Sequence, residues 1–287
     1  KTRKTKAQRT ATSRISFDAL GDRMTFGVND YAHEQIAARL QIPRPFYKRM
    51  LTDHPDVFDR DIETLWQREP EVRMLRTLDD RVRAFVSDGY RPIDNVLIAS
   101  GALPVLAEQQ QMQIESAEVT DRKLYIKALF LDRQQTITTV RNEKRPVAAG
   151  LVISNSEVGA GSVNVEQMVF DLVCTNGMIG ESIFRRHHVG KKGGNGLDHD
   201  EAHEWLRDET VQAGDNALMM RLHDIIRGSM DQSKFSGLVE QMQGATTQMI
   251  EGDPAKVVEV AVKKLDMREG ERVGVLRHLI EGGDLSR

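Results

Sequence analysis

The fold is decided by the stretch KLYIKALFL, which occupies residues 123–131. Successive side chains of a β-strand point to opposite faces of the sheet, so the stretch divides into two sets. One set is Leu124, Ile126, Ala128 and Phe130, and the other is Tyr125, Lys127, Leu129 and Leu131. Both sets are mostly apolar, which is typical of a central strand in a sheet covered on both faces.

The flanking sequence predicts further strands around this one. Short runs of alternating apolar and polar residues, bounded by turn residues, are typical of antiparallel strands. Asp79-Asp80 separates two such runs with the spacing of a hairpin. The predicted strands are 71–78, 81–87, 113–119, 123–131, 136–140 and 147–154.

Apolar residues at helical spacing predict helices on either side of these strands. Asn29 and Asp30 are placed to cap the first of them. The helix that starts at Pro92 is expected to end at Ser100-Gly101, because Pro104 follows. After a glycine-marked turn, Val165 to Val173 predict a central helix that Asn176-Gly177 stops. The predicted helices in this part are 30–40, one around 46–51, 55–66, 92–101 and 164–173.

From Asp198 the pattern is helical almost to the end of the sequence. One apolar stripe is Leu218, Leu222, Ile225 and Ile226. Asp253 and Pro254 are typical of a helix start, and a last helix is expected from Val273 to Ile280. The predicted fold class is α+β, with antiparallel strands packed against helices and a helical C-terminal region. The predicted segments are a basic arm at 1–17, a helical subdomain at 18–70, an α+β core at 71–197 and helices at 198–287.

Charge is unevenly distributed along the chain. The formal net charge is −3, yet the first 17 residues carry six basic residues and no acid. A second basic cluster, Arg185-Arg186-His187-His188 with Lys191-Lys192, leads into the glycine-rich stretch GGNG at 193–196. Flexible glycines beside cations suit a loop that contacts phosphates, and an ordinary basic surface loop has the same composition. The acidic total therefore still allows one basic face.

Catalytic motifs are not apparent. His199 and His203 share a helical face with acids nearby, but the order HDEAH differs from the HExxH of zinc proteases. Cys174 is expected to be a small buried residue rather than a nucleophile. We expect no cofactor and no bound metal, and a non-catalytic binding protein rather than an enzyme. With one cysteine and no run near the roughly 18 apolar residues of a membrane span, a cytoplasmic location without membrane contact is expected.

Several longer blocks resemble a known family. They are RVRAFVSD at 81–88 with YRPIDN at 90–95, SNSEVGAGS at 154–162 with LVCTNG at 172–177, RRHHVG at 185–190 and LRHLIEGG at 276–283. Together they resemble the phage- and plasmid-borne "domain of unknown function 932" family, from about Pro43 to the C-terminus. That family name implies no activity.

The expected order of elements is also similar to the core of the Rad-fifty-two-type single-strand annealing superfamily. This similarity implies a homo-oligomeric ring or filament that binds single-stranded DNA and promotes annealing in recombination or repair. Phe85, Tyr90 or Tyr125 would then stack on bases. The candidate DNA-binding residues are Arg81, Arg83, Tyr90, Arg91, Lys123, Lys127, Arg133, Arg141, Lys144, Arg145, Arg185, Arg186, His187, His188, Lys191 and Lys192.

Two other functions fit the same sequence. A metal-dependent nucleic-acid enzyme would use His187, His188, His199, His203 and neighbouring acids. A non-catalytic protein of a mobile element that binds a host factor would need none of these residues. The solvated surface of an ordinary domain would also explain the paired charges on strand 81–87.

Overall fold

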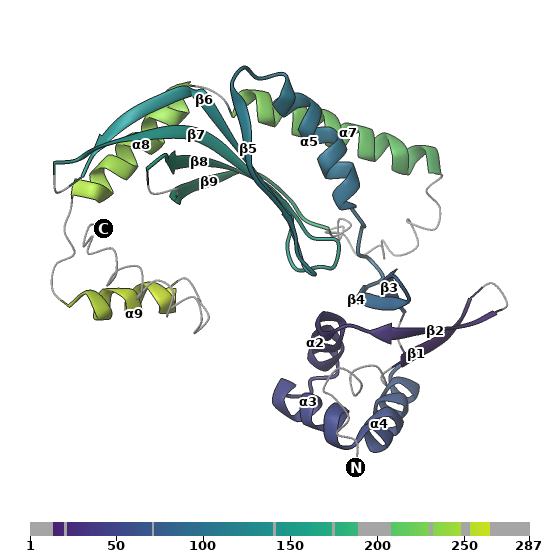
Figure 1. Ribbon diagram of the computed structural model, residues 1–287. Coiled ribbons are helices and arrows are strands. Elements are labelled where there is room, and N and C mark those ends of the chain that lie inside the picture. The colour runs from purple at the N-terminus through teal and green to yellow at the C-terminus, as the bar shows by residue number, and fades with distance from the viewer. Residues whose placement is uncertain are drawn as a thin grey trace, which may run out of the picture.

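The computed structural model describes residues 14–19, 22–70, 72–139, 142–173, 176–188, 208–229, 232–247 and 253–264 (Figure 1). Helices pack against antiparallel strands, so the predicted α+β class is confirmed. The strands form two separate sheets. The described helices are α2 (Asp30–Arg39), α3 (Arg44–Asp53), α4 (Pro55–Arg68), α5 (Asn95–Ala107), α7 (Asp208–Gly228), α8 (Gln232–Thr247) and α9 (Pro254–Lys264).

A four-stranded sheet and three helices make up what we call the N-terminal unit. Its strands lie in the order β1-β2-β4-β3, and helices α2, α3 and α4 complete it. Apolar side chains from both layers form its core, with Ile36 and Val82 almost fully buried. The strands are β1 (Arg14–Ala19), β2 (Asp22–Val28), β3 (Arg73–Leu78) and β4 (Arg81–Ser87).

The β1–β2 hairpin corrects the predicted start of the chain. Sequence placed a flexible arm at 1–17 and only helices at 18–70, whereas β1 begins at Arg14 and pairs antiparallel with β2. Ser16 and Thr25 form a cross-strand hydrogen bond of 2.8 Å between their hydroxyl groups. The alternation of apolar and polar residues in β1 and β2 is short and follows a strongly basic segment, so the sequence did not indicate a hairpin here. β2 also pairs with β4, in parallel, at Gly27 and Val28.

The β3–β4 hairpin agrees with its sequence prediction. Asp79 and Asp80 both adopt positive φ, at 48° and 57°. Such angles at both central residues define the mirror-image turn that matches the twist of paired strands, and aspartate tolerates them better than most residues. Because β4 pairs with β2, this hairpin completes the N-terminal sheet rather than the larger one.

The larger sheet, which we call the main sheet, is antiparallel throughout and has the order β5-β6-β7-β8-β9. Residues 124–131 lie in β6, an interior strand between the edge strand β5 and the central strand β7, and β6 does not end there. It continues to Thr138 past an irregularity between Phe130 and Gln134, so the predicted strand at 136–140 is the second half of β6. The strands are β5 (Met112–Val119), β6 (Leu124–Thr138), β7 (Lys144–Asn155), β8 (Val163–Asp171) and β9 (Asn176–Arg186).

The central helix predicted at 164–173 is wrong, because these residues form strand β8. Val163, Val165 and Val169 face the helices, while Met168 and Phe170 lie on the opposite face. A strand with apolar residues on both faces can imitate helical spacing, and its β-branched valines favour a strand. Asn176-Gly177 accordingly begins β9 instead of ending a helix.

Helix α5 is longer than predicted. It runs through Gly101 and Pro104 to Ala107 because Val105 and Leu106 are buried in the core. Gly101 serves packing rather than helix termination: a Cβ atom there would lie 2.4 Å from the sulfur of Met219 on α7. A larger residue at this position would require the flexible Met219 side chain to move, so glycine favours the close packing of these two helices.

Helices α5, α7 and α8 cover one face of the main sheet (Figure 1). Leu218, Leu222 and Ile226 are buried there and Ile225 packs against them, which confirms the predicted stripe. Phe235 and Val239 of α8 extend the same core. Helix α9 begins at Pro254 as predicted, and the helix predicted at 273–280 lies outside the described residues.

Candidate nucleic-acid interface

The second face of the main sheet carries no helix among the described elements, and we call it the uncovered face. Its apolar cluster consists of Leu129, Val152, Met168 and Phe170, with Leu131 and Leu172 packed alongside. None of these residues belongs to a described helix. The sheet thus has a helix-covered face that forms the main core and an opposite face whose apolar cluster is also buried, at 2–6% exposure. The partly exposed side chains around that cluster, Tyr125 and Lys127 among them, remain accessible to a partner.

Three cations and one aromatic side chain share a region of the uncovered face, and we call Lys123, Tyr125, Lys127 and Arg185 the Tyr125 patch. Lys123 and Lys127 are each two residues from Tyr125, and Arg185 lies three strands away from it. The Lys123 ammonium is 6.0 Å from the centre of the Tyr125 ring. Tyr125 and Lys127 point to the same face because they are two apart on β6, and their neighbours Leu124 and Ile126 are buried in the main core.

Arg185 joins this patch through the strand register. Tyr125 pairs with Ser154, Ser154 with Asn164, and Asn164 with Arg185. The Arg185 guanidinium donates a hydrogen bond of 3.3 Å to the Asn164 side-chain oxygen. The row therefore crosses four neighbouring strands from β6 to β9, and Asn164 orients its terminal arginine.

Acidic residues share the same face. Glu118 of β5 is paired with Tyr125, and Glu166 of β8 lies in the row of Lys127, with the buried Val152 between them. The aliphatic stem of a lysine can cover such a valine while its ammonium stays in water. The face is therefore mixed in charge, with Lys123 and Lys127 near Tyr125 and Arg185 at the far end of its row.

The predicted turn at 155–161 connects the two sheets. Glu157 accepts hydrogen bonds from the Arg83 guanidinium of β4 at 3.0 Å and from the Asn95 backbone N–H of α5 at 2.6 Å. The Gln35 amide of α2 donates to the Val158 carbonyl at 2.8 Å. Gly159 has a φ of 78°, which favours glycine. This turn is thus a structural joint rather than an anion site.

Four of the predicted DNA-binding residues lie around this joint instead of on the uncovered face. Arg83 pairs with Glu157, and Arg91 pairs with Asp215 of α7 at 2.9 Å. The Tyr90 ring stacks on His188 at 5.2 Å between centroids and donates its hydroxyl to the Ser156 carbonyl at 3.0 Å.

Burial changes the titration of the stacked pair. It raises the pKa of Tyr90 to about 12, and it lowers the pKa of His188. Both rings are more than nine-tenths buried. The two rings therefore stack on each other inside the protein, and the faces in contact are not accessible to a base.

The remaining candidates are spread over the chain. Lys144 and Arg145 begin β7, where Arg145 approaches Asp171 at 3.5 Å and Glu143 at 3.3 Å. Arg133 lies over the Phe130 ring, 5.3 Å from its centre, at the irregularity of β6. Arg81 and His187 are exposed, Arg186 is half-buried at the end of β9, and Arg141, Lys191 and Lys192 lie outside the described residues.

The structure brings together a subset of the predicted cations and places the others apart. Arg122 was not a candidate, yet its guanidinium stacks 4.5 Å from the centre of the Tyr31 ring and pairs with Glu34 at 2.7 Å. Asn164 is the first residue of the helix predicted at 164–173, and in the structure it positions Arg185 from strand β8 instead. Neither role leaves a local pattern, because each depends on contacts between distant segments.

Within the described residues, His, Cys, Asp and Glu nowhere gather in groups of three that could hold a metal ion. His199, His203 and Cys174 lie outside this part of the chain. None of the described helices combines the length and apolar composition needed to cross a membrane.

The fold and the site define an α+β protein whose main antiparallel sheet is covered on one face by α5, α7 and α8 and carries none of the described helices on the other. The model of the family described as Domain of unknown function (DUF932) matches residues 83–251, more than half of the chain, and the protein belongs to that family. No curated protein and no solved structure matches the chain. The matched region contains the joint, all of the main sheet and helices α5, α7 and α8.

Proposed function

We propose that this protein binds single-stranded DNA along the uncovered face of the main sheet and promotes the annealing of complementary strands. The observation that carries the proposal is the Tyr125 patch, in which Lys123 and Lys127 lie on either side of Tyr125 in sequence and Arg185 extends the same row three strands away. In keeping with this activity, we propose a homo-oligomer that serves recombination or repair in a mobile element.

The chemistry of the patch suits an unpaired strand. Lysine and arginine attract the phosphate backbone without reading sequence, and an aromatic ring can stack on a base of any kind. The row from Glu118 to Arg185 crosses five strands and, at about 4.8 Å per strand, spans roughly 19 Å. A short segment of extended DNA could lie across it with its bases exposed for pairing.

Binding of a fluorescent oligothymidine, followed by anisotropy over a range of salt concentrations, tests the proposal. For the native protein we expect the affinity to fall steeply with log salt. Lys127→Ala removes one phosphate contact, so the slope of log affinity against log salt should decrease by about 0.7. Lys48→Ala, which removes an exposed lysine of α3 in the N-terminal unit, is the matched control and should change nothing.

The aromatic contribution is tested at Tyr125. Replacing it by leucine removes a stacking platform worth about 1–3 kcal/mol per base, so binding should weaken at least fivefold, whereas Tyr125→Phe should retain it. No binding at low salt, or equal losses for Lys127→Ala and Lys48→Ala, would contradict the proposed site.

Annealing is measured by energy transfer between dyes on two complementary oligonucleotides. Native protein should accelerate pairing more than Lys127→Ala does, and electron microscopy of the DNA complex should show rings or filaments. Cleavage of the oligonucleotide that a chelator abolishes would instead favour a metal-dependent enzyme. Capture of a host factor without DNA would favour the interaction protein.

A further inference from the structure

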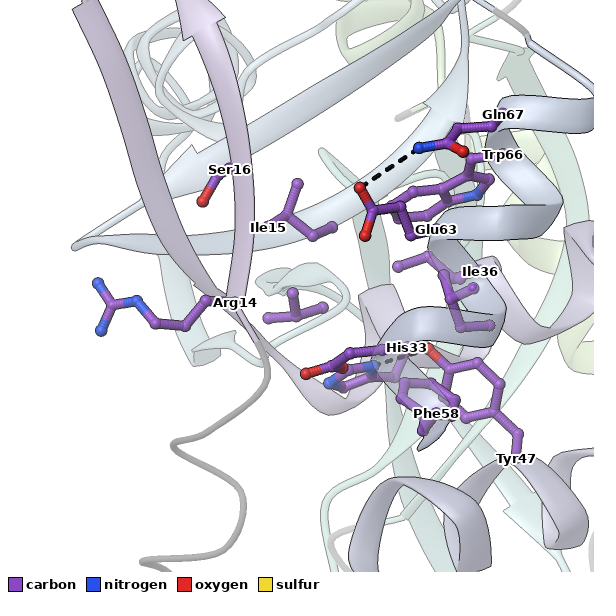
Figure 2. A pocket seen from close by; sticks show the side chains of 13 residues that line it. Arg14, Ile15, Ser16, His33, Ile36, Tyr47, Phe58, Glu63, Trp66 and Gln67 are labelled. Atoms are coloured by element: carbon purple, nitrogen blue, oxygen red, sulfur yellow. Dashed lines mark hydrogen bonds between the residues drawn. The ribbon is translucent and has the colours of Figure 1, made fainter. Parts of the chain in front are cut away.

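The N-terminal unit contains a cavity of about 460 Å³ that lies apart from the uncovered face (Figure 2). Cavities that hold small organic ligands commonly have volumes of 300–1,000 Å³ and mostly apolar walls. Strand β1 and helices α2 and α4 supply most of the walls here. The apolar lining consists of Ile15, Val28, Ile36, Phe58, Ile62 and Trp66.

The cavity has polar as well as apolar walls, and one of its lining residues carries a buried polar atom that lacks a partner in the described part of the chain. His33 is 7% exposed, and its Nδ1 atom forms a hydrogen bond of 2.9 Å with the Tyr47 hydroxyl. Its Nε2 atom is buried without a hydrogen-bond partner among the described residues. In Figure 2 a dashed line joins one ring nitrogen to Tyr47, and the other nitrogen points away from it towards the side of Arg14.

Desolvation fixes the protonation state of this imidazole. Burial lowers the pKa of His33 to about 4, so the ring is neutral at pH 7. A neutral imidazole nitrogen can donate or accept one hydrogen bond, depending on its tautomer. Polar atoms in protein interiors are nearly always paired, so an unpaired Nε2 beside a cavity indicates a position for a ligand's polar group.

The rim of the cavity is predominantly acidic. Asp59 and Glu63 lie one turn apart on α4, and both carboxylates are exposed at the opening. Arg14 is the only cation among the lining residues that the structure describes. Carboxylates next to the aromatic rings of Phe58 and Trp66 favour a positively charged group over an anion.

We propose that this cavity binds a small aromatic amine. Its ring would occupy the apolar interior, a hydroxyl group at the buried end would hydrogen-bond to His33 Nε2, and its ammonium group would lie at the rim near Asp59 and Glu63. The site is independent of DNA binding, because none of its residues belongs to the main sheet. A second cavity of about 320 Å³ shares Ile15, Ser16 and Trp66 with the first and offers room for a longer substituent.

Four probes of nearly equal shape test each part of the proposal by calorimetry on the full-length protein. They are tyramine, phenethylamine without the hydroxyl, tyrosol without the charge, and 4-hydroxyphenylpropionate with the opposite charge. Tyramine should bind with one-to-one stoichiometry. Phenethylamine should bind about tenfold more weakly and tyrosol about threefold more weakly, and the anion should show no binding.

A charge-reversal pair locates the ammonium group. Glu63→Lys reverses a rim carboxylate and should weaken tyramine about tenfold while leaving tyrosol unchanged. Asp61→Lys makes the same change on an exposed position of α4 that lines neither cavity, and should leave both affinities unchanged. Both positions are exposed, so thermal unfolding should verify that each variant is folded.

The proposal would be overturned if tyramine failed to bind at millimolar concentration, or if all four probes bound alike. Equal losses for Glu63→Lys and Asp61→Lys would overturn it as well. Quenching of Trp66 fluorescence gives a second readout: tyramine should change the emission of the native protein, and the change should disappear in Trp66→Phe. Loss of DNA binding in Lys127→Ala with unchanged tyramine binding would keep the two proposals distinct.

Discussion

Lowering the pH from 7 to 4 is expected to destabilise the N-terminal unit through His33. In the folded protein burial lowers the pKa of this imidazole from 6.5 to about 4. Between these two values the unfolded chain binds a proton that the folded chain does not, so folding stability falls as the pH falls. At 1.36 kcal/mol per pH unit, the loss approaches about 3 kcal/mol at pH 4. Above pH 6.5 the imidazole is neutral in both the folded and the unfolded protein, so it causes no loss of folding stability there.

Comparison with a His33→Phe variant isolates this contribution from that of the carboxylates. The variant loses the hydrogen bond to Tyr47 at every pH, which is a constant cost of about 1 kcal/mol. Only the part of the stability difference that changes with pH measures the effect of protonating the His33 imidazole. Relative to the native protein, the variant should therefore gain about 3 kcal/mol between pH 7 and pH 4.

Urea unfolding followed by tryptophan fluorescence is the suitable assay, because Trp66 stacks on Phe85 within the N-terminal unit, 6.0 Å between ring centres. The difference in free energy of unfolding between the two proteins is measured at half-unit steps of pH. A difference that stays constant from pH 7 to pH 4 would refute the reasoning. So would a His33 pKa near 6.5 in an NMR titration of the folded protein.

Three further changes test the packing that supports the candidate sites. Gly150→Ala should destabilise the protein by about 1–3 kcal/mol in urea unfolding, because a Cβ atom there would lie 2.8 Å from the Ala128 carbonyl oxygen of the neighbouring strand. Unchanged stability would show that β6 and β7 can separate locally. Glu157→Gln should cost about 2 kcal/mol because it leaves the half-buried Arg83 without its carboxylate, and adding Arg83→Gln should recover part of that loss; additive losses would contradict the pairing. Gly159→Ala should cost about 1 kcal/mol because φ is 78°, and no change in the thermal midpoint would argue against a strained turn.

Local patterns were sufficient where a segment has one clearly buried face or a specific turn. The alternation of apolar and polar residues predicted the strand at 81–87, in which Val82, Ala84 and Val86 are buried, and Asp79-Asp80 predicted its turn. Helix α2 begins after Asn29, whose side chain accepts a hydrogen bond of 2.7 Å from the Ala32 backbone N–H. In each case the signal lies within a few residues of the element it defines.

The same local reasoning failed where burial on both sides obscures the period. Strand β8 has apolar residues on both faces, so its sequence fits a helix as well as a strand. Only pairing with β7 and β9 selects the strand. Gly101 and Pro104 indicated a helix end, but contacts with α7 keep α5 helical through both positions. Tertiary packing outweighs local preference here because the buried apolar area supplies more free energy than the weak intrinsic bias.

The candidate DNA site also has one part that the sequence determined and another that only the tertiary structure determined. Sequence alone determined that Tyr125 and Lys127 share a face, because they are two residues apart in a strand. It could not place Arg185, 60 residues further along the chain, in the same row of the sheet three strands away; the register through Ser154 and Asn164 decides that. Nor could it show that Arg83 and Arg91 are paired with Glu157 and Asp215. A side chain's direction follows from the local backbone, whereas its neighbours depend on how distant segments are paired and packed.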